Sequence, residues 1–144
     1  MKESDIMQSF LNQLDENLIF IKSEIIDNAI KIFCEFKLIE GKLVHSRKIR
    51  VIKDIPFGSL KVELHLLSKK YFNDDPTLDK LTVAEKVNFI GESKRRTRRL
   101  DEYILNTCKE MSAIGCERFI KENIADVSDT TILRLIKKNE QISK

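Results

Sequence analysis

Residues 93–108 read Ser-Lys-Arg-Arg-Thr-Arg-Arg-Leu-Asp-Glu-Tyr-Ile-Leu-Asn-Thr-Cys, and they divide the chain into two parts of different texture. The stretch opens with five basic side chains in the six positions from Lys94 to Arg99. It continues with apolar residues at helical spacing, with Leu100 and Ile104 on one stripe. The stretch therefore predicts a helix that begins in a cationic lead-in.

This cationic lead-in suggests an external anion. Positive charge at the N-terminus of a helix opposes the helix macrodipole, which is a local cost. Two interpretations stay open: a contact with the phosphates of nucleic acid, or a solvated run of charge. The candidate phosphate contacts are Lys94, Arg95, Arg96, Arg98 and Arg99.

Two further helices are expected after this one. The second covers about residues 113–122, and the third begins at Ser128, a good N-cap residue. Helix, short connection and capped helix form a helix-turn-helix-like arrangement. The outward positions of the third helix are Thr130, Thr131, Arg134, Lys137 and Lys138. Within that set Thr130, Thr131 and Arg134 are the candidates for contacts with base edges.

Upstream of the cluster the texture is that of β-strands. A short amphipathic helix over residues 4–14 precedes apolar and β-branched runs at 20–26, 29–38, 43–52 and 60–66, separated by short turns. This pattern predicts an antiparallel meander with one solvated face. The third run carries Arg47, Lys48 and Arg50, which would extend a cationic footprint.

The expected fold class is α+β, in three segments. Residues 1–76 would form the helix and antiparallel sheet, and residues 77–92 a linker with a short helix. Residues 93–144 would form a three-helix, helix-turn-helix-like bundle. A chain of 144 residues suits one domain or two small ones.

Composition narrows the function classes. No apolar run approaches the roughly 18 residues that span a bilayer, and the N-terminus lacks a signal-peptide pattern, so a cytoplasmic location without membrane contact is expected. The net charge of +3 is unevenly spread: −4 over residues 1–40, +6 over 41–72, −3 over 73–85 and +4 over 86–144. Separate basic blocks favour an acidic partner.

The three cysteines predict neither a disulfide framework nor a metal site. Their number is odd and no CxxC pair is present. Cys108 and Cys116 fall within apolar helical patterns and are expected to be buried as small hydrophobic residues. His45 and His65 lack neighbouring ligands, so neither a metal nor another cofactor is expected.

An enzyme is not expected. The sequence holds no Gly-rich phosphate loop, no spaced Ser-His-Asp or Cys-His set and no H-x-E metal motif. The adjacent pairs Asp74-Asp75 and Asp101-Glu102 are interpreted as turn and helix-surface carboxylates.

An ordered set of short motifs resembles a known family. The motifs are His45-Ser-Arg47, Ile55-Pro56, Lys69-Lys-Tyr71, Arg95-Arg-Thr-Arg-Arg99 and Val127-Ser-Asp-Thr-Thr-Ile-Leu-Arg134. In this order they resemble the amino-terminal portion of the ISL-three family of bacterial insertion-sequence transposases, over about residues 18–140. The resemblance implies a zinc-binding domain, then a helix-turn-helix that reads terminal repeats, then a DDE catalytic core.

Two departures from the family alter these expectations. The four zinc cysteines of the family would fall at Cys34, Lys37, Asn73 and Leu78, so one of four ligands is retained and no structural zinc is predicted. The chain ends near Lys144, about where the catalytic core would begin, so transposition chemistry by this chain is not expected.

The leading hypothesis is a non-catalytic protein that binds double-stranded DNA, related to the terminal-repeat recognition end of a transposase, as a regulator or inhibitor of transposition or transcription. The alternative is a protein–protein interaction module, an adaptor or inhibitor built on a repurposed transposase remnant. The target sequence, the identity of a protein partner and the oligomeric state stay open.

Overall fold

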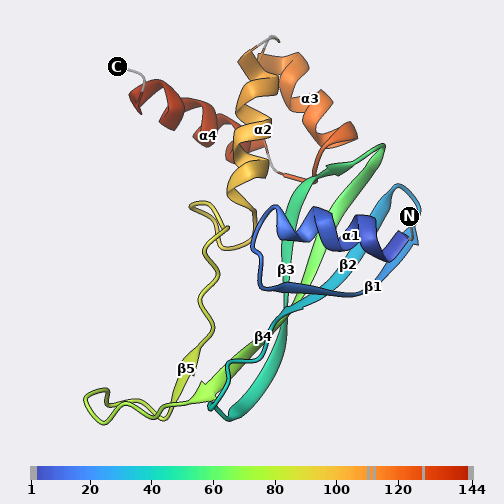
Figure 1. Cartoon of the computed structure of the whole chain (residues 1–144). Coiled ribbons are helices and arrows are strands. Elements are labelled where there is room, and N and C mark those ends of the chain that lie inside the picture. Colours follow the sequence, from blue (N-terminus) through green and yellow to red (C-terminus); the bar gives the residue numbers. More distant parts are fainter. Residues whose placement is uncertain (1–2, 110, 112, 128, 143–144) are drawn as a thin grey trace.

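Figure 1 shows a curved sheet with one helix lying across it and three helices gathered at one of its ends. The computed structural model describes residues 3–109, 111, 113–127 and 129–142. In chain order the elements are α1 (Glu3–Asn12), β1 (Leu18–Ile26), β2 (Ala29–Phe36), β3 (Val44–Phe57), β4 (Leu60–Phe72), β5 (Thr82–Ala84), α2 (Arg98–Lys109), α3 (Ala113–Asn123) and α4 (Asp129–Ile142). The expected α+β class is confirmed at this level.

The five-stranded sheet is mixed, and the expected antiparallel meander is wrong. The strand order is β1-β2-β4-β3, with β5 beside β4, and β2 pairs with β4 in parallel. The hairpins β1–β2 and β3–β4 are antiparallel. Side chains explain the order: β4 alternates the buried residues Val62, Leu64 and Leu66 and takes the centre, whereas β3 carries Lys48 and Arg50, which suit a solvated edge.

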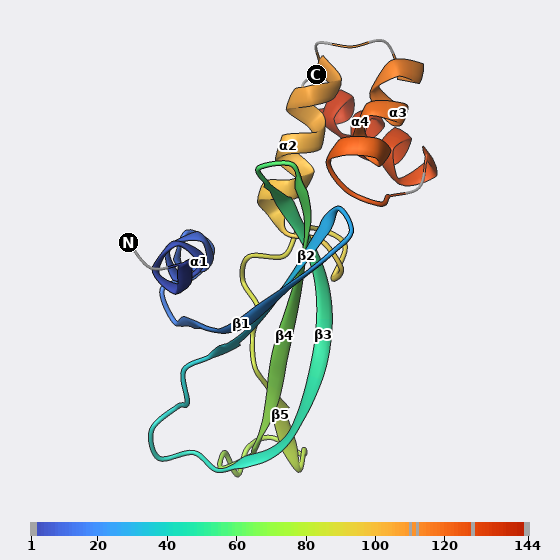
Figure 2. The same cartoon turned by 90° about the vertical axis from the view of Figure 1, so that its right-hand side faces the viewer.

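Helix α1 packs against one face of the sheet, and Figure 2 shows it to one side of the strands. Its buried residues Met7 and Leu11 join a core formed mainly by β2 and β4. Gln8 fixes the helix to the edge of β1: its Oε1 accepts from Phe20 N at 2.8 Å, and its Nε2 donates to Leu18 O at 2.7 Å. These bonds satisfy backbone groups that an edge strand otherwise leaves unpaired.

Residues 77–92 are joined to the sheet more closely than a linker would be. In place of the expected short helix they contain β5, whose Val83 pairs with Tyr71 of β4. Farther along, Phe89 is buried in the sheet core and its ring lies 6.1 Å from that of Phe36. This segment therefore carries the chain along the sheet toward α2.

The three C-terminal helices share a second hydrophobic core. The predicted stripe of α2 is confirmed for Leu100 and Ile104, which are buried against residues of α3 and α4 such as Ile120 and Ile132. Ile55 of β3 packs against the same core, so the helices and the sheet are in contact. Among the described residues, no helix is long and apolar enough to cross a membrane.

The prediction that Cys108 and Cys116 are unpaired is wrong. The two cysteines form a disulfide between the end of α2 and α3, with a Cα–Cα distance of 5.3 Å. Cys116 is buried, as expected, but Cys108 is only partly so. An odd number of cysteines misled the analysis, because Cys34 lies in the sheet core and stays free, leaving the other two as a pair.

Candidate nucleic-acid interface

The basic run from Lys94 to Arg99 is divided by the fold into internal and exposed cations. The Nε of Arg96 donates to Asp101 Oδ1 at 2.7 Å, and both side chains are largely buried. The guanidinium of Arg99 binds both carboxylate oxygens of Asp54, with 2.8 Å from Nε to Oδ1. We therefore no longer assign a phosphate contact to Arg96 or Arg99. Among the expected contacts, these two are corrected to structural residues.

Arg98 has an intermediate status. Its Nη2 donates to the carbonyl oxygens of Asn88 and Ile90, at 3.1 and 3.4 Å. The residue is exposed, yet its guanidinium holds the incoming segment against the start of α2. It contributes positive charge at the surface without being wholly available to a ligand.

Asp54 organises the junction between sheet and helices. It is fully buried on β3, and its Oδ1 also accepts from the Thr97 hydroxyl at 2.7 Å. The same hydroxyl oxygen accepts from Leu100 N at 3.2 Å and so caps α2. Backbone bonds between Lys53 and residues 95 and 97 extend this junction, with Lys53 N donating to Arg95 O at 2.8 Å and Thr97 N donating to Lys53 O at 3.0 Å.

Sequence reasoning missed Asp54, Thr97 and Asp101 as partners of the basic run. One signal was available for Asp54, because it occupies an inward position of a strand, two residues after the buried Ile52. A carboxylate there needs a buried cationic partner. Nothing local could have named that partner, since Arg99 lies 45 residues farther along the chain.

The exposed cations line a hollow beside the free edge of β3, which we call the edge hollow. Lys94 and Arg95 are exposed on the loop, and Arg50 Nη2 donates to Lys94 O at 3.3 Å. The hollow measures about 840 Å³, and its lining includes no acidic side chain. Its lining residues are Lys48, Ile49, Arg50, Val51, Lys53, Val87, Ile90, Lys94 and Arg95.

An adjoining hollow lies under α4, and we call it the helix hollow. It measures about 580 Å³ and is lined by Thr131 and Arg134 of α4 together with Arg95 and Lys53, which it shares with the edge hollow. The fold therefore brings the predicted outward residues of the third helix beside the predicted cationic loop. These groups come from positions about 40 residues apart in the sequence.

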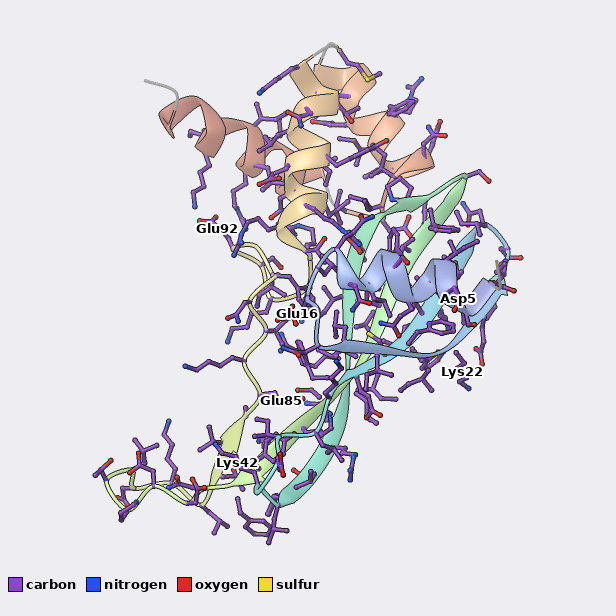
Figure 3. All side chains as sticks on the ribbon, in the orientation of Figure 1. Asp5, Glu16, Lys22, Lys42, Glu85 and Glu92 are labelled. Carbon is purple, nitrogen blue, oxygen red and sulfur yellow. A yellow bond between two sulfur atoms is a disulfide. The ribbon has the colours of Figure 1, made fainter. Side chains whose placement is uncertain are left out.

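The two carboxylates at the helix hollow are each engaged by a cation. Asp126 Oδ1 accepts from Lys61 Nζ at 2.8 Å. Glu92, labelled in Figure 3, forms an ion pair with Lys138, which removes Lys138 from the set of unengaged candidates. The electrostatic character of the combined surface is therefore positive around Arg95 and Arg134.

The remaining predicted residues are distributed as follows. Lys137 is exposed on α4, and Arg47 is exposed on β3 but lines neither hollow. Thr130 lies in the first turn of α4, and its side chain is not among those described. Ser128, the expected N-cap, lies outside the described residues.

The four positions that the resemblance assigns to zinc ligands do not converge. Cys34 pairs with Leu66 on β4, seven residues before Asn73, which places them roughly 20 Å apart along the strand at about 3.3 Å per residue. Burial raises the pKa of the Cys34 thiol to about 12, with smaller contributions from Asp54 and Glu35, so the thiol is not readily ionised. Within the described residues no three His, Cys, Asp or Glu side chains gather as metal ligands. The absence of structural zinc stays a prediction.

Asn73 has a different role at its position. Its Nδ2 is directed at three carbonyl oxygens, those of Asp75, Leu78 and Lys80, at 2.7–3.1 Å. Its Oδ1 accepts from Asp75 N at 2.9 Å. One side-chain amide thus fixes the loop that follows β4.

Comparison with protein-family models, curated proteins and solved structures finds no match to this chain.

Proposed function

We propose that this chain is a non-catalytic protein that binds double-stranded DNA across the helix hollow and the edge hollow. The observation that carries the proposal is the convergence of Arg134 from α4 and Arg95 from the loop on one hollow, continued by the acid-free edge hollow. Clustered Arg and Lys on one face are the electrostatic footprint of a protein that binds a phosphate backbone.

In this proposal the residues divide the work. Helix α4 enters a major groove as the second helix of a helix-turn-helix formed with α3, so that Thr130, Thr131 and Arg134 meet base edges. Lys48, Arg50, Lys94 and Arg95 hold phosphates on the flank. The resemblance to the recognition end of ISL-three transposases supports this assignment. Such a protein would occupy terminal repeats or a promoter and thereby regulate transposition or transcription.

A titration of the protein against a duplex of random sequence at several salt concentrations tests the proposal. Neutralising about four phosphates predicts a slope of log affinity against log salt of roughly −4. The double variant Lys94→Ala/Arg95→Ala should bind much more weakly and with a slope shallower by about 2. The matched control Lys22→Ala/Lys31→Ala removes the same charge from the β1–β2 hairpin and should leave the slope unchanged.

The second candidate function is an interaction module for another protein. It is favoured by one specific observation: Arg96 and Arg99 are bound internally by Asp101 and Asp54, which reduces the charge left for DNA. The same titration separates the candidates. Absence of duplex binding by the folded wild-type chain at low salt would reject the DNA proposal and favour the interaction module.

A further inference from the structure

The end of the sheet farthest from α2–α4 gathers exposed large apolar side chains. In Figure 1 it is the end where β5 and the loop before it project from the body. Leu43 and Leu81 there are 74% and 73% exposed. Single exposed apolar residues are ordinary, but a group at one end marks an interaction surface. The members of this group are Leu38, Ile39, Leu43, Phe72, Leu78 and Leu81.

One part of this end is a concave surface, which we call the distal hollow. It measures about 570 Å³ and has an apolar floor that includes Phe36, Tyr71 and Val83. Its rim carries three lysines, Lys37, Lys42 and Lys86. Lys42 is labelled in Figure 3, close to Glu85.

The acidic residues at the distal hollow offset this charge only in part. Glu85 is engaged by the buried Lys69: its Oε1 accepts from Lys69 N at 2.8 Å, and its Oε2 lies 3.4 Å from Lys69 Nζ. That leaves Asp15 as the acidic side chain in the lining without this engagement. The distal hollow therefore presents cations around an apolar floor, which suits an acidic segment with apolar side chains.

The other part is convex and has the complementary character. Residues 73–81 form what we call the distal loop, which carries Asp74, Asp75 and Asp79 with the exposed Leu78 and Leu81. The loop is held in one shape by the Asn73 amide, and Asp75 Oδ1 accepts from Thr77 N and Thr77 Oγ1 at 2.9 and 2.7 Å. A preformed loop loses little conformational entropy on docking.

We propose that a second copy of this chain docks here, so that the distal loop of each copy occupies the distal hollow of the other. Loop and hollow lie at the same end of one chain, and Thr82–Ala84 connects them directly. A two-fold axis at this end therefore lets both exchanges occur together, as in an isologous dimer. Leucines meet the apolar floor while aspartates meet lysines.

The mass of the full chain in solution, measured without DNA over a wide range of concentration, tests the dimer. The wild-type mass should rise from 16.8 kDa toward double that value. Leu78→Ser/Leu81→Ser should raise the concentration of half-dimerisation at least about tenfold, because such anchors carry much of an interface's energy. Circular dichroism establishes that each variant is folded.

Charge reversal gives a sharper result. Asp74→Lys/Asp79→Lys and Lys37→Glu/Lys42→Glu should each be monomeric alone, since each opposes like charges across both exchanges. An equimolar mixture should restore the dimer, because a reversed loop then meets a reversed hollow. The control Ile49→Ser/Val51→Ser removes two exposed apolar residues from β3 and should leave the dimer intact.

Three outcomes would overturn the proposal. A wild-type chain that stays at monomer mass at every concentration leaves this end to a different kind of partner. Dissociation by Ile49→Ser/Val51→Ser but not by the distal variants places the dimer on β3 instead. Failure of the charge-reversed mixture to associate while wild type dimerises excludes the reciprocal exchange.

Discussion

The guanidinium of Arg99, in the first turn of α2, binds the carboxylate of Asp54, which is fully buried on β3. The same guanidinium lies 4.4 Å from the ring centroid of Phe10 in α1. One side chain thus joins the sheet, the N-terminal helix and the C-terminal helices. Because the carboxylate has no access to water, its charge depends on this partner and on Thr97.

Replacement of Arg99 should destabilise the chain strongly. Arg99→Ala leaves Asp54 buried without its cation, and loss of one partner of a buried pair costs about 3–5 kcal/mol. Urea denaturation followed by circular dichroism measures the free energy of unfolding. Arg99→Ala/Asp54→Asn should recover part of the loss, because the amide carries no charge. Equal stability of Arg99→Ala and wild type would show that the pair does not hold the junction.

Two neighbouring arginines should give opposite phenotypes. Arg95→Ala should weaken duplex binding with little change in unfolding free energy, because its side chain is exposed at both hollows. Arg96→Ala should lower the unfolding free energy by about 2 kcal/mol or more, since Asp101 loses its ion pair. Duplex anisotropy and urea denaturation on both variants give the comparison. Destabilisation by Arg95→Ala alone would reverse these assignments.

Gly91 should not tolerate a side chain. A Cβ at this position would run into Asp101 Oδ2, which is held in place by its bond to Arg96. Gly91→Ala is therefore expected to destabilise by about 1–3 kcal/mol, as overpacking of a fixed site does. Gly41→Ala is a control for alanine itself: it meets open space but a φ of +80°, so its cost reports backbone conformation only. Thermal melting of both variants measures the effect.

Thiol counting should reveal the disulfide. The denatured, unreduced chain should show one free thiol, that of Cys34, and reduction should bring the number to three. Closing the eight-residue separation predicts about 2.5 kcal/mol of stabilisation in the chain-entropy treatment. Cys108→Ser should lower the unfolding free energy by a comparable amount. Three free thiols before reduction would contradict the pairing.

Cys34 should resist alkylation in the native state. Its pKa is raised from 9.0 to about 12, chiefly by burial, so the folded chain keeps the thiol protonated at pH 9.5 while the unfolded chain does not. The unfolded state then binds fewer protons, and this group lowers stability as the pH rises from 9 toward 12. Iodoacetamide labelling at pH 9.5 with and without denaturant, followed by mass spectrometry, checks it. Rapid labelling of the native chain would be the contrary result.

Local patterns in the sequence were sufficient for the elements but not for their arrangement. Apolar alternation predicted the core positions of β4, and the 3.6-residue stripe predicted Leu100 and Ile104 in α2. The parallel pairing of β2 with β4 was missed because β3 intervenes in the chain, and pairing between non-consecutive strands leaves no local signal. The strand β5 was missed because three residues are too few to show a period.

The candidate site was predicted in outline. The cations Lys94, Arg95 and Arg134 were identified from charge density and helical spacing, and the fold places Arg95 and Arg134 around one hollow. Which arginines would be consumed internally was not predictable. That depends on Asp54 and Asp101, whose approach to the basic run is decided by tertiary packing.

The amide of Asn73 has a consequence for where this molecule can work. It gathers three carbonyl oxygens through hydrogen bonds alone, so the tip beyond β4 needs no bound ion to keep its form. Chelating media and metal-poor compartments should therefore leave the leucines of that tip presented in the same way.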